Sequence, residues 1–589
     1  MSRAEQAQNG LPGLDERLRP TADRGKLRLR VFWALIAALF FVSLWQTGFT
    51  PWRLLSSVDN VVNLLQRMWP PSFVEWERYV RALVVTLWMV FAGTALALMM
   101  SVPLAVLAAR NTTTGRVAYS FSRAVITFTR AVPDIVFALI FVRAIGLGPT
   151  AGVLAIALNS VGMVGKFYSD RIEEIDEGPV EALRTTGATR LQVLSTAVMP
   201  QVLTNWIALA LYRVDINIRS AVIIGFVGGG GIGVELQRVQ GQLAYQRLMA
   251  IVLIIFVLIV ATEKISDAVR RAIVGEDAGY DANPFKLRNR IRNARASTSS
   301  PRLSEPGAVD EGPVGSLLSD APVKPKPSSR LRPPRNLNDV KKWTLSWGAL
   351  ALILTSFALL GLTPWRLLAA TADIIPYIGS MFPPDFVTNF DRFAPLMLET
   401  LWMALAATVL GMVLSLPVGV LAARNASPSF LVYRLGRWAT IVVRGIPELI
   451  LAVIFVVAVG LGPFAGVLAL TIGSIGMSAK LIADAIEDTP LSQSTEALRA
   501  VGATWLQRTF TVTLPQAMPA IVGVGIYTFD VYVRAAAILG IVGAGGIGIA
   551  LDATVRTGAF DQTLAVILWI FATVYAVERL SGWVRSQVL

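Results

Sequence analysis

The chain has 589 residues, of which 54% are hydrophobic and 16% are charged, and its mean hydropathy is +0.59. Because soluble proteins carry about a quarter of their residues as charged side chains, this composition predicts an integral membrane protein. The chain has no Cys and no His, which excludes disulfides, thiolate or imidazole metal sites and imidazole bases, so we expect neither an enzyme nor a metal site. We interpret the net charge of +14 as a topology signal rather than as a nucleic-acid site.

The first half of the chain has the pattern of six membrane spans. Residues 1–30 are polar and carry Lys and Arg directly before an apolar run, which predicts a cytoplasmic N-terminal arm and an uncleaved first span. Residues 48–78 have the pattern of an interfacial amphipathic stretch. Six spans return the chain to the cytoplasm. The apolar segments of spanning length are 31–47, 80–108, 120–145, 148–166, 199–224 and 246–265.

Residues 275–342 are polar and rich in Pro and Ser, with basic residues gathered near their start. Such a composition buries too little apolar surface to fold alone, so we expect a disordered, basic cytoplasmic linker. Its default role is that of a tether. Contact between its clustered charges and the headgroups of anionic membrane lipid is the alternative.

After the linker the pattern of the first half begins again. GFTPWRLL recurs as GLTPWRLL 313 residues later, and Glu181 recurs as Glu496, 315 residues later. This small drift in register indicates one duplicated unit, with a first repeat at 31–274 and a second at 343–589. Since each repeat holds an even number of spans, we expect parallel repeats related by a pseudo-two-fold axis along the membrane normal. The spans of the second repeat are predicted at 345–361, 395–422, 437–459, 462–481, 514–539 and 563–583.

Each repeat contains one polar segment between very apolar ones. EALRTTGATRLQVLSTAVMP begins at Glu181, and EALRAVGATWLQRTFTVTLP begins at Glu496. We predict about one amphipathic helix in each copy, which would serve as a docking surface for a partner on the aqueous side. An ordinary cytoplasmic loop is the alternative, and the second copy argues against it.

Charged residues inside the predicted spans indicate a polar pathway, because a charge within a membrane is costly. In the third span Arg130 and Asp134 flank a proline, and Arg444 and Glu448 do the same in the second repeat. The proline bends the helix and frees a backbone carbonyl that a neighbouring helix or water must satisfy. All four charged residues are candidates for the substrate pathway.

The fifth spans carry two further pairs of opposite charge. Asp215 and Arg219 are four residues apart, as are Asp530 and Arg534, so each pair lies on one helix face. These residues are pathway candidates as well. Mutual neutralisation with a purely structural role is the alternative.

Arg213 breaks the symmetry between the repeats. Thr528 stands at its repeat position, and Tyr532 stands at the position of Asn217. A guanidinium without a charged partner is suited to bind phosphate-like oxygens in bidentate fashion. We therefore predict that Arg213 is the stronger candidate for contact with an anion, and that its mutation to Ala impairs anion transport.

A glycine-rich run follows each fifth span, GFVGGGGIG in the first repeat and GIVGAGGIG in the second. A nucleotide loop would require Gly-Lys-Ser/Thr after a strand, and neither run has it. We expect the glycines to permit a sharp turn and close helix approach near an outer gate, with simple helix packing as the alternative. The predicted gate glycines are Gly228, Gly231, Gly233, Gly543, Gly546 and Gly548.

The Glu-Ala-Leu, Gly and Leu/Met-Pro pattern of the two polar segments resembles the EAA coupling motif of ABC importer permeases, whose cytoplasmic helix sits in a cleft of the ATPase subunit. More narrowly, RAVPDIVFALIFVRAIGLGPTAGVLAIALNSVGMVGKFYSDRIEEID and its counterpart RGIPELILAVIFVVAVGLGPFAGVLAL resemble the phosphonate-importer permease family. The resemblance covers essentially both repeats. Family members are usually single units that dimerise, so the chain resembles a fused pseudo-dimer.

The resemblance implies an all-α polytopic membrane protein with the type I ABC importer permease fold. It implies a phosphonate permease in the inner membrane of a prokaryote, with the N-terminus, linker and C-terminus in the cytoplasm. The implied partners are two copies of a cytoplasmic ATPase and an extracytoplasmic phosphonate-binding protein. The chain itself would bind no cofactor, because the ATPase uses ATP and Mg. The implied coupling residues are Glu181, Ala182, Gly187, Glu496, Ala497 and Gly502.

Three alternatives remain at this stage. The chain could be an ABC permease for another small solute, such as phosphite or methionine. It could be a proton-coupled secondary transporter, because parallel six-plus-six repeats occur in that class too; the polar segments and the missing His relay argue against it. A scaffold without transport is the weakest alternative, because interior Arg and Asp residues need a polar pathway.

Overall fold

The computed structural model describes residues 24–274, 337–489 and 492–588, and all regular structure in these ranges is helical. The predicted arm at 1–30 and linker at 275–342 lie outside the described residues, except at their ends. There, helix α2 (Arg24–Gln46) begins within the range assigned to the arm, and helix α14 (Leu337–Leu359) begins within the range assigned to the linker.

The helices of the second repeat follow the order of the first. Proline opens helices at matching places, where its missing N–H costs nothing. The first repeat continues with α3 (Pro51–Met68), α4 (Trp76–Ala108), α5 (Arg116–Ala131), α6 (Asp134–Ile145), α7 (Pro149–Glu173), α8 (Gly178–Thr185), α9 (Arg190–Val193), η1 (Leu194–Val198), α10 (Met199–Ile224), η2 (Gly225–Gly229), α11 (Ile232–Gly241) and α12 (Tyr245–Val274). The second continues with α15 (Pro364–Ser380), α16 (Phe390–Ala422), α17 (Phe430–Arg444), α18 (Glu448–Val459), α19 (Pro463–Asp488), α20 (Ser492–Ala500), α21 (Trp505–Arg508), η3 (Thr509–Thr513), α22 (Leu514–Leu539), η4 (Gly540–Val542), α23 (Gly548–Thr557) and α24 (Phe560–Val588).

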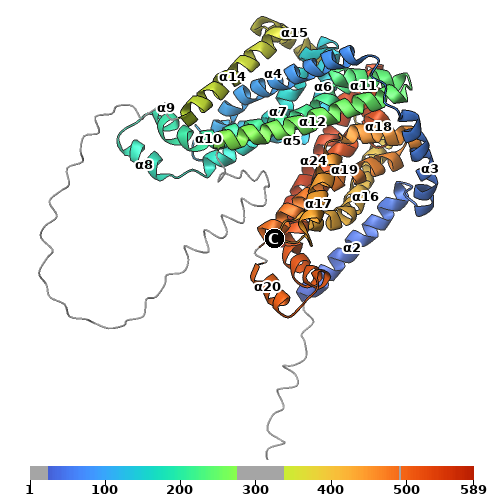
Figure 1. Ribbon diagram of the computed structural model, residues 1–589. Coiled ribbons are helices and arrows are strands. Elements are labelled where there is room, and N and C mark those ends of the chain that lie inside the picture. The colour runs from blue at the N-terminus through green and yellow to red at the C-terminus, as the bar shows by residue number, and fades with distance from the viewer. Residues whose placement is uncertain (1–23, 275–336, 490–491, 589) are drawn as a thin grey trace, which may run out of the picture. The chain divides into compact units, whose positions relative to one another are not determined.

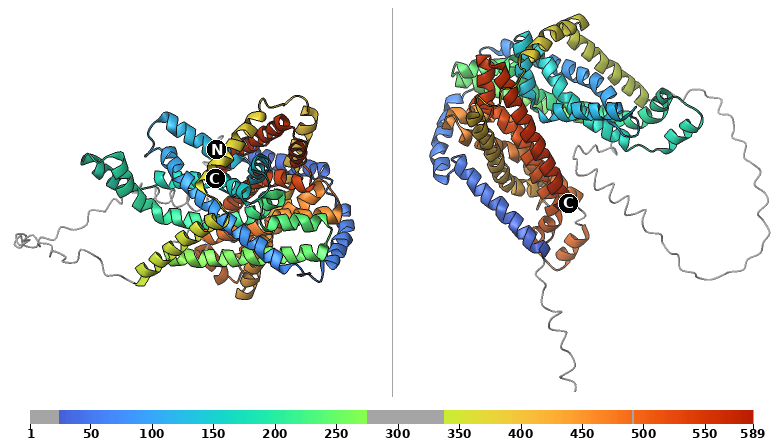
Figure 2. Two further views of the ribbon diagram at one scale, coloured as in Figure 1. Left: turned by 90° about the horizontal axis from the view of Figure 1, so that it is seen from above. Right: turned by 180° about the vertical axis from the view of Figure 1, so that it is seen from behind.

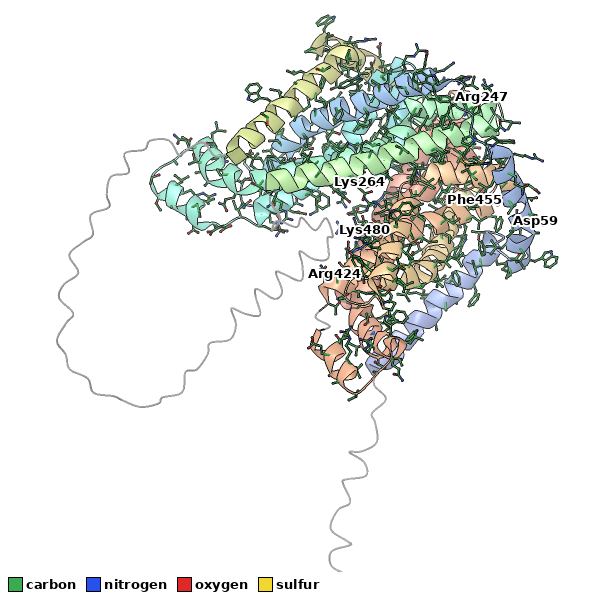
Figure 3. The ribbon with its side chains drawn as sticks, in the orientation of Figure 1. Asp59, Arg247, Lys264, Arg424, Phe455 and Lys480 are labelled. Atoms are coloured by element: carbon green, nitrogen blue, oxygen red, sulfur yellow. The ribbon has the colours of Figure 1, made fainter. Side chains whose placement is uncertain are left out.

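The chain forms two compact units, and the two repeats exchange their first helices between them (Figures 1 and 2). In unit 1, α2 packs against α16 and α3 packs against α18, so the start of the first repeat joins the second repeat. Figure 3 marks Asp59 on α3 and Phe455 on α18. In unit 2, α14 packs against α4 of the first repeat. Unit 1 comprises Met1–Pro70, Ser380–Ala483 and Ile521–Leu589, and unit 2 comprises Pro71–Gly379 and Asp484–Ala520.

Seven helices of the described residues are long and apolar enough to cross a membrane, and up to eleven if each of four bent pairs is one span. Two predicted spans need correction. The span predicted at 120–145 is α5 and α6, which meet at 93°, and the span at 437–459 is α17 and α18, which meet at 76°. In both, the proline expected to bend one helix instead ends it and caps the next. Helix α10 has the bounds predicted for the fifth span of the first repeat. It is not one of the seven helices that are long and apolar enough to cross a membrane.

Candidate functional site

The first polar segment is a helix, a turn and a second helix, which corrects the expectation of about one helix. Helix α8 ends at Thr185, and Gly187 adopts φ +77°. The N–H of Gly187 donates to Arg184 O at 3.1 Å, and the N–H of Ala188 donates to Leu183 O at 3.3 Å. This pair of bonds is a Schellman motif, which needs a left-handed residue after the helix. Gly187 therefore ends helix α8 and turns the chain toward the next helix.

The second polar segment repeats the same geometry. Gly502 also adopts φ +77°, and the N–H of Ala503 donates to Leu498 O at 3.0 Å. After each glycine a capping box opens the next helix, through Thr189 and Gln192 in the first repeat and their counterparts Thr504 and Gln507. The turn between the helices is therefore fixed on both sides, and its shape is the same in both repeats.

The predicted coupling residues lie on exposed surface. Glu181, Ala182, Glu496 and Ala497 are all exposed, and the side chain of neither glutamate forms a hydrogen bond or ion pair with another described residue. Leu191 in the first segment is 77% exposed. An exposed carboxylate and a large exposed apolar side chain on one short segment are typical of a surface that a partner covers.

Buried contacts tie the first segment to the spans. Val180 of α8 lies in a core cluster with Tyr168 of α7 and Trp206 of α10. The two aromatic rings stack with centroids 4.2 Å apart, and the Tyr168 hydroxyl donates to Trp206 O at 3.0 Å. The Gln201 side chain also exchanges two hydrogen bonds with the backbone of Asp176, at 3.0 and 3.2 Å. These contacts join α8 to α7 and α10.

The candidate charges of the third span lie on the two sides of the helix break. Arg130 is in the last turn of α5, and Asp134 is buried in the first turn of α6. Arg444 and Glu448 have the same places at the ends of α17 and α18. A glycine on the following helix allows close approach to each break: a Cβ on Gly162 would lie 2.8 Å from the backbone N of Arg130.

The charged pairs of the fifth spans form ion pairs, as their spacing predicts. Arg219 Nη2 lies 3.3 Å from Asp215 Oδ2 and 4.0 Å from Glu263 on α12. Arg534 Nη2 lies 2.9 Å from Asp530 Oδ2. The structure brings these residues together in the pairs that the sequence favoured. Whether substrate contacts them stays a prediction.

Arg213 lies inside the first repeat, at 4% exposure, with polar neighbours that the sequence analysis missed. Its Nε donates to Ser160 Oγ at 3.0 Å, and Ser160 donates to Asn217 at 3.1 Å. Asn217 in turn donates to Thr94 at 2.8 Å. Nη1 of Arg213 lies 2.9 Å from the Met163 sulfur, and Nη2 is buried without a hydrogen-bond partner among the described residues. The Nη2 amino group is thus an unused donor.

Helix α6, which begins at Asp134, packs against α10, which carries Arg213. The carboxylate of Asp134 is buried and accepts a hydrogen bond from the backbone N of Ile135 at 2.9 Å. The break in the third span therefore lies on a helix that contacts the fifth span, although residues 134 and 213 are 79 residues apart in sequence.

The second repeat has a hydroxyl at the position of the Arg213 guanidinium. Thr528 replaces Arg213, and its hydroxyl lies 3.0 Å from Ser478, which lies 3.0 Å from Ser474. Tyr532 replaces Asn217 and is fully buried. Glu448 is longer than its counterpart and lies over Gly473, where a Cβ would come within 2.9 Å of its Cγ.

The glycine runs form the turns that the sequence predicts. Gly228 and Gly543 adopt φ +100° and +84°, and each carbonyl accepts a hydrogen bond from the glycine directly before the fourth span of its repeat, at 3.0 Å for Gly148 and 2.9 Å for Gly462. The other predicted gate glycines lie in the same turns, Gly231 and Gly546 with positive φ, Gly233 and Gly548 at close backbone contacts. Their role as a gate stays a prediction.

Two features at the glycine-turn end were not predicted. Glu399 accepts a hydrogen bond from Gly546, and Glu75 joins a cluster of charged residues from three helices. Both leave a signal in the repeat alignment. Val85 stands at the position of Glu399, and Asn389 stands at the position of Glu75.

Within the described residues, no group of three or more Asp, Glu, His or Cys is placed to hold a metal ion. The buried polar side chains of the interior offer hydrogen bonds and charge. They carry hydroxyl groups, carboxylates and guanidinium groups.

Comparison with known proteins places both repeats in one group. Residues 101–274 and 415–585 each match the family described as "binding-protein-dependent transport system inner membrane component". The chain is 43% identical, over 93% of both chains, to the phosphate-import permease protein PhnE of Mycolicibacterium smegmatis. It is 38% identical to the phosphite transport system permease protein PtxC of Stutzerimonas stutzeri, over 40% of this chain and 87% of that protein.

A solved structure of the MetNI methionine ABC transporter in inward-facing conformations is 30% identical in sequence. The match covers 33% of this chain and 94% of the chain in that structure, with a TM-score of 0.30.

Proposed function

Since the chain belongs to the family of binding-protein-dependent transport system inner membrane components, we propose that it is the permease of an ABC importer for phosphonates or related small phosphorus oxyanions. The observation that carries the proposal is the similarity over 93% of the chain to a phosphate-import permease. Permeases named for phosphite and phosphonate transport are further relatives of single repeats. Like these permeases, the chain is a multi-pass inner-membrane protein.

The partners follow from the family. An ABC permease works with a separate ATPase, which uses ATP and Mg, and with a substrate-binding protein. We propose that two copies of the ATPase grip the segments around Glu181 and Glu496, and that the binding protein delivers the oxyanion on the opposite side of the membrane. The exposed carboxylates and the two Schellman turns support this assignment. The coupling segments, the N-terminus and the C-terminus then lie in the cytoplasm.

Substrate passage uses the polar interior. ATP-driven closure of the ATPase displaces α8, and the Val180 cluster passes this displacement to α7 and α10. Arg213 on α10 holds one unused donor, Nη2, which is suited to an oxyanion oxygen. The pairs Asp215–Arg219 and Asp530–Arg534 neutralise themselves and add little net charge.

The test is ATP-dependent uptake by liposomes that hold this chain, its candidate ATPase and its binding protein. We expect uptake of 2-aminoethylphosphonate that requires ATP and the binding protein. Uptake driven by a proton gradient without ATP would overturn the ABC mechanism.

Phosphate is the second candidate substrate, because the relative that matches the whole length of the chain is named for phosphate import. Competition decides between the two. If phosphate displaces 2-aminoethylphosphonate from the binding protein and is itself taken up faster, phosphate is the substrate; if 2-aminoethylphosphonate prevails, the phosphonate assignment holds.

A further inference from the structure

The glycine-turn end of each repeat is held by different forces in the two repeats. This end carries α11 in the first repeat and α23 in the second, and Figure 1 shows α11 at the end of its bundle opposite to α8 and α9. One bond is shared. The hydroxyl of Thr86 accepts from Ile232 N at 2.8 Å, and that of Thr400 accepts from Ile547 N at 2.8 Å.

In the first repeat a chain of ion pairs joins three helices. Arg238 of α11 donates to Glu75, which precedes α4, and Arg247 of α12 donates to the same carboxylate at 2.8 Å. Glu235 of α11 accepts from Arg78 of α4 at 2.8 Å. Figure 3 shows Arg247 at this end of α12, with Lys264 farther along the helix. Helix α11 cannot leave α4 and α12 unless several of these pairs separate.

The hydrogen bond from Arg238 lowers the pKa of Glu75, and the charges of Arg238 and Arg247 act in the same direction. The Glu75 carboxylate is therefore ionised and paired at any pH near neutral. Each pair is partly exposed and weak alone, but pairs that share groups form a network.

The second repeat has none of these groups at the matching positions except Arg392, which replaces Arg78. The counterparts of Glu75, Glu235, Arg238 and Arg247 are Asn389, Ala550, Ala553 and Gln562. The described ion pair of α23, Asp552–Arg556 at 2.7 Å, lies within that helix and ties it to no neighbour.

Glu399 holds the second glycine turn instead. Its Oε1 accepts from the N–H of Gly546 at 2.9 Å, and a Cβ on Gly545 would come within 2.6 Å of the same oxygen. Both glycines have positive φ, +93° and +78°, and turns of this kind present backbone N–H groups to an anion. Val85 stands at this position in the first repeat, where Gly231 N–H makes no hydrogen bond with another described residue.

A carboxylate within an apolar span is costly, so one that bonds a single backbone N–H calls for a functional explanation. A charge-assisted bond to one N–H is strong enough to favour the closed turn and can be broken in one step. The ion-pair chain of the first repeat has to break in several steps.

We propose that the glycine-turn end of the second repeat is the one that opens during transport, that the first repeat stays closed there, and that Glu399 is the positioning residue that recloses the second turn. The proposal rests on the proposed function, because opening is taken to belong to an ATP-driven cycle. The claim that Glu399 holds the second glycine turn closed at rest does not depend on ATP-driven transport.

The chain has no cysteine, so a single introduced thiol reports on one place. Leu551 of α23 and Leu236 of α11 stand at matching positions and are 1% and 0% exposed. Leu551→Cys and Leu236→Cys are purified with the candidate ATPase and binding protein, and their reaction rates with a maleimide are compared at rest and during ATP turnover. We expect turnover to accelerate Leu551→Cys about tenfold and Leu236→Cys less than about twofold. Equal acceleration of the two thiols overturns the proposal.

The role of Glu399 is tested at rest, without ATP or partners. In the Leu551→Cys background we expect Glu399→Val to raise the labelling rate about tenfold, since it removes a charge-assisted hydrogen bond. Glu399→Gln keeps an acceptor oxygen and should restore most of the protection. In the Leu236→Cys background Val85→Glu should slow labelling.

Thr400→Val and Thr86→Val are the matched controls, because they remove the bond that both repeats share and should change the two thiols alike. Unfolding temperature and elution as a single species show that each variant is folded. An unchanged labelling rate in Glu399→Val and in Glu399→Gln overturns the role of Glu399. If the wild-type complex shows no ATP-driven uptake, the proposed function fails, while the resting-state rates still decide whether Glu399 holds the turn.

Discussion

The interiors of the two repeats share a backbone and differ in chemistry. The first encloses Arg213 with Ser160 and Asn217, and the second encloses Thr528 with two serines. Both have the broken third span, the Schellman turn and the glycine turn. Duplication has therefore kept the helix break and the two kinds of turn, and has let the buried polar side chains diverge. A homodimer could not make this division, because its two interiors are identical.

The largest effect should come from the feature that the repeats share. Gly187→Val with Gly502→Val forces a β-branched residue into the left-handed conformation, which costs about 1–2 kcal/mol at each site. Two sites correspond to a loss of about 30- to 1000-fold in the population of the coupled geometry. We expect ATP-driven uptake to fall accordingly while the chain still inserts in the membrane.

The control for the glycine pair is Gly187→Asn with Gly502→Asn, because Asn tolerates the left-handed conformation. It should keep most of the uptake. Equal loss in the Val and Asn variants would show that the backbone conformation is not what matters there.

The next effect separates the two interiors. Arg213→Ala removes a buried guanidinium with a free donor, and we expect uptake to fall about 10- to 100-fold, as for loss of a hydrogen bond to a charged group. Thr528→Val, at the repeat position, removes one hydroxyl and should cost much less. Initial uptake rates of the two variants, normalised to assembled complex, make the comparison; unchanged uptake in Arg213→Ala removes that residue from the substrate path.

A third change tests whether each interior has its own matched pair of packed residues. Gly473→Asn places a side chain against Glu448, where even a Cβ has only 2.9 Å, and should lower the free energy of unfolding by about 1–3 kcal/mol. The first repeat has Asn159 and the shorter Asp134 at these positions. The double variant Gly473→Asn with Glu448→Asp should recover most of the loss in thermal unfolding, and additive losses would contradict this packing.

The smallest effect concerns pH. Because its hydrogen bond from Arg238 lowers the pKa of Glu75, the stability that this carboxylate contributes is present above its ordinary pKa of about 4.3 and is lost as the pH falls through the lower folded-state value. Between pH 7 and pH 4 the unfolding temperature should fall slightly less in Glu75→Gln than in the wild type. Asn389→Ala in the second repeat should show the same fall in unfolding temperature as the wild type.

Local signals predicted much of this structure. The spacing of Asp215 and Arg219 predicted an ion pair, and the duplicated register predicted two matching sets of helices. Each depends on residues that are close in sequence or on one repeat copied into the other. The break at Pro133 was predicted only as a bend, because sequence does not reveal how far neighbouring helices let the chain turn.

Long-range partners could not be predicted. Ser160 is 53 residues from Arg213, and Arg238 is 163 residues from Glu75. The length of its apolar run predicted that α2 crosses the membrane and gave no sign that it packs against α16. The repeat alignment did contain the difference between Glu399 and Val85, but its meaning depends on the glycine turn that lies beside it.

The exchange of first helices has a consequence for biosynthesis. Because α2 and α3 pack against helices of the second repeat, the ribosome makes them hundreds of residues before their partners, and unit 1 cannot be complete until the last spans have been inserted. Separate half-length chains could pair with copies of themselves and give assemblies with two Arg213 interiors or with none. Joining the halves in one polypeptide fixes the ratio at one of each.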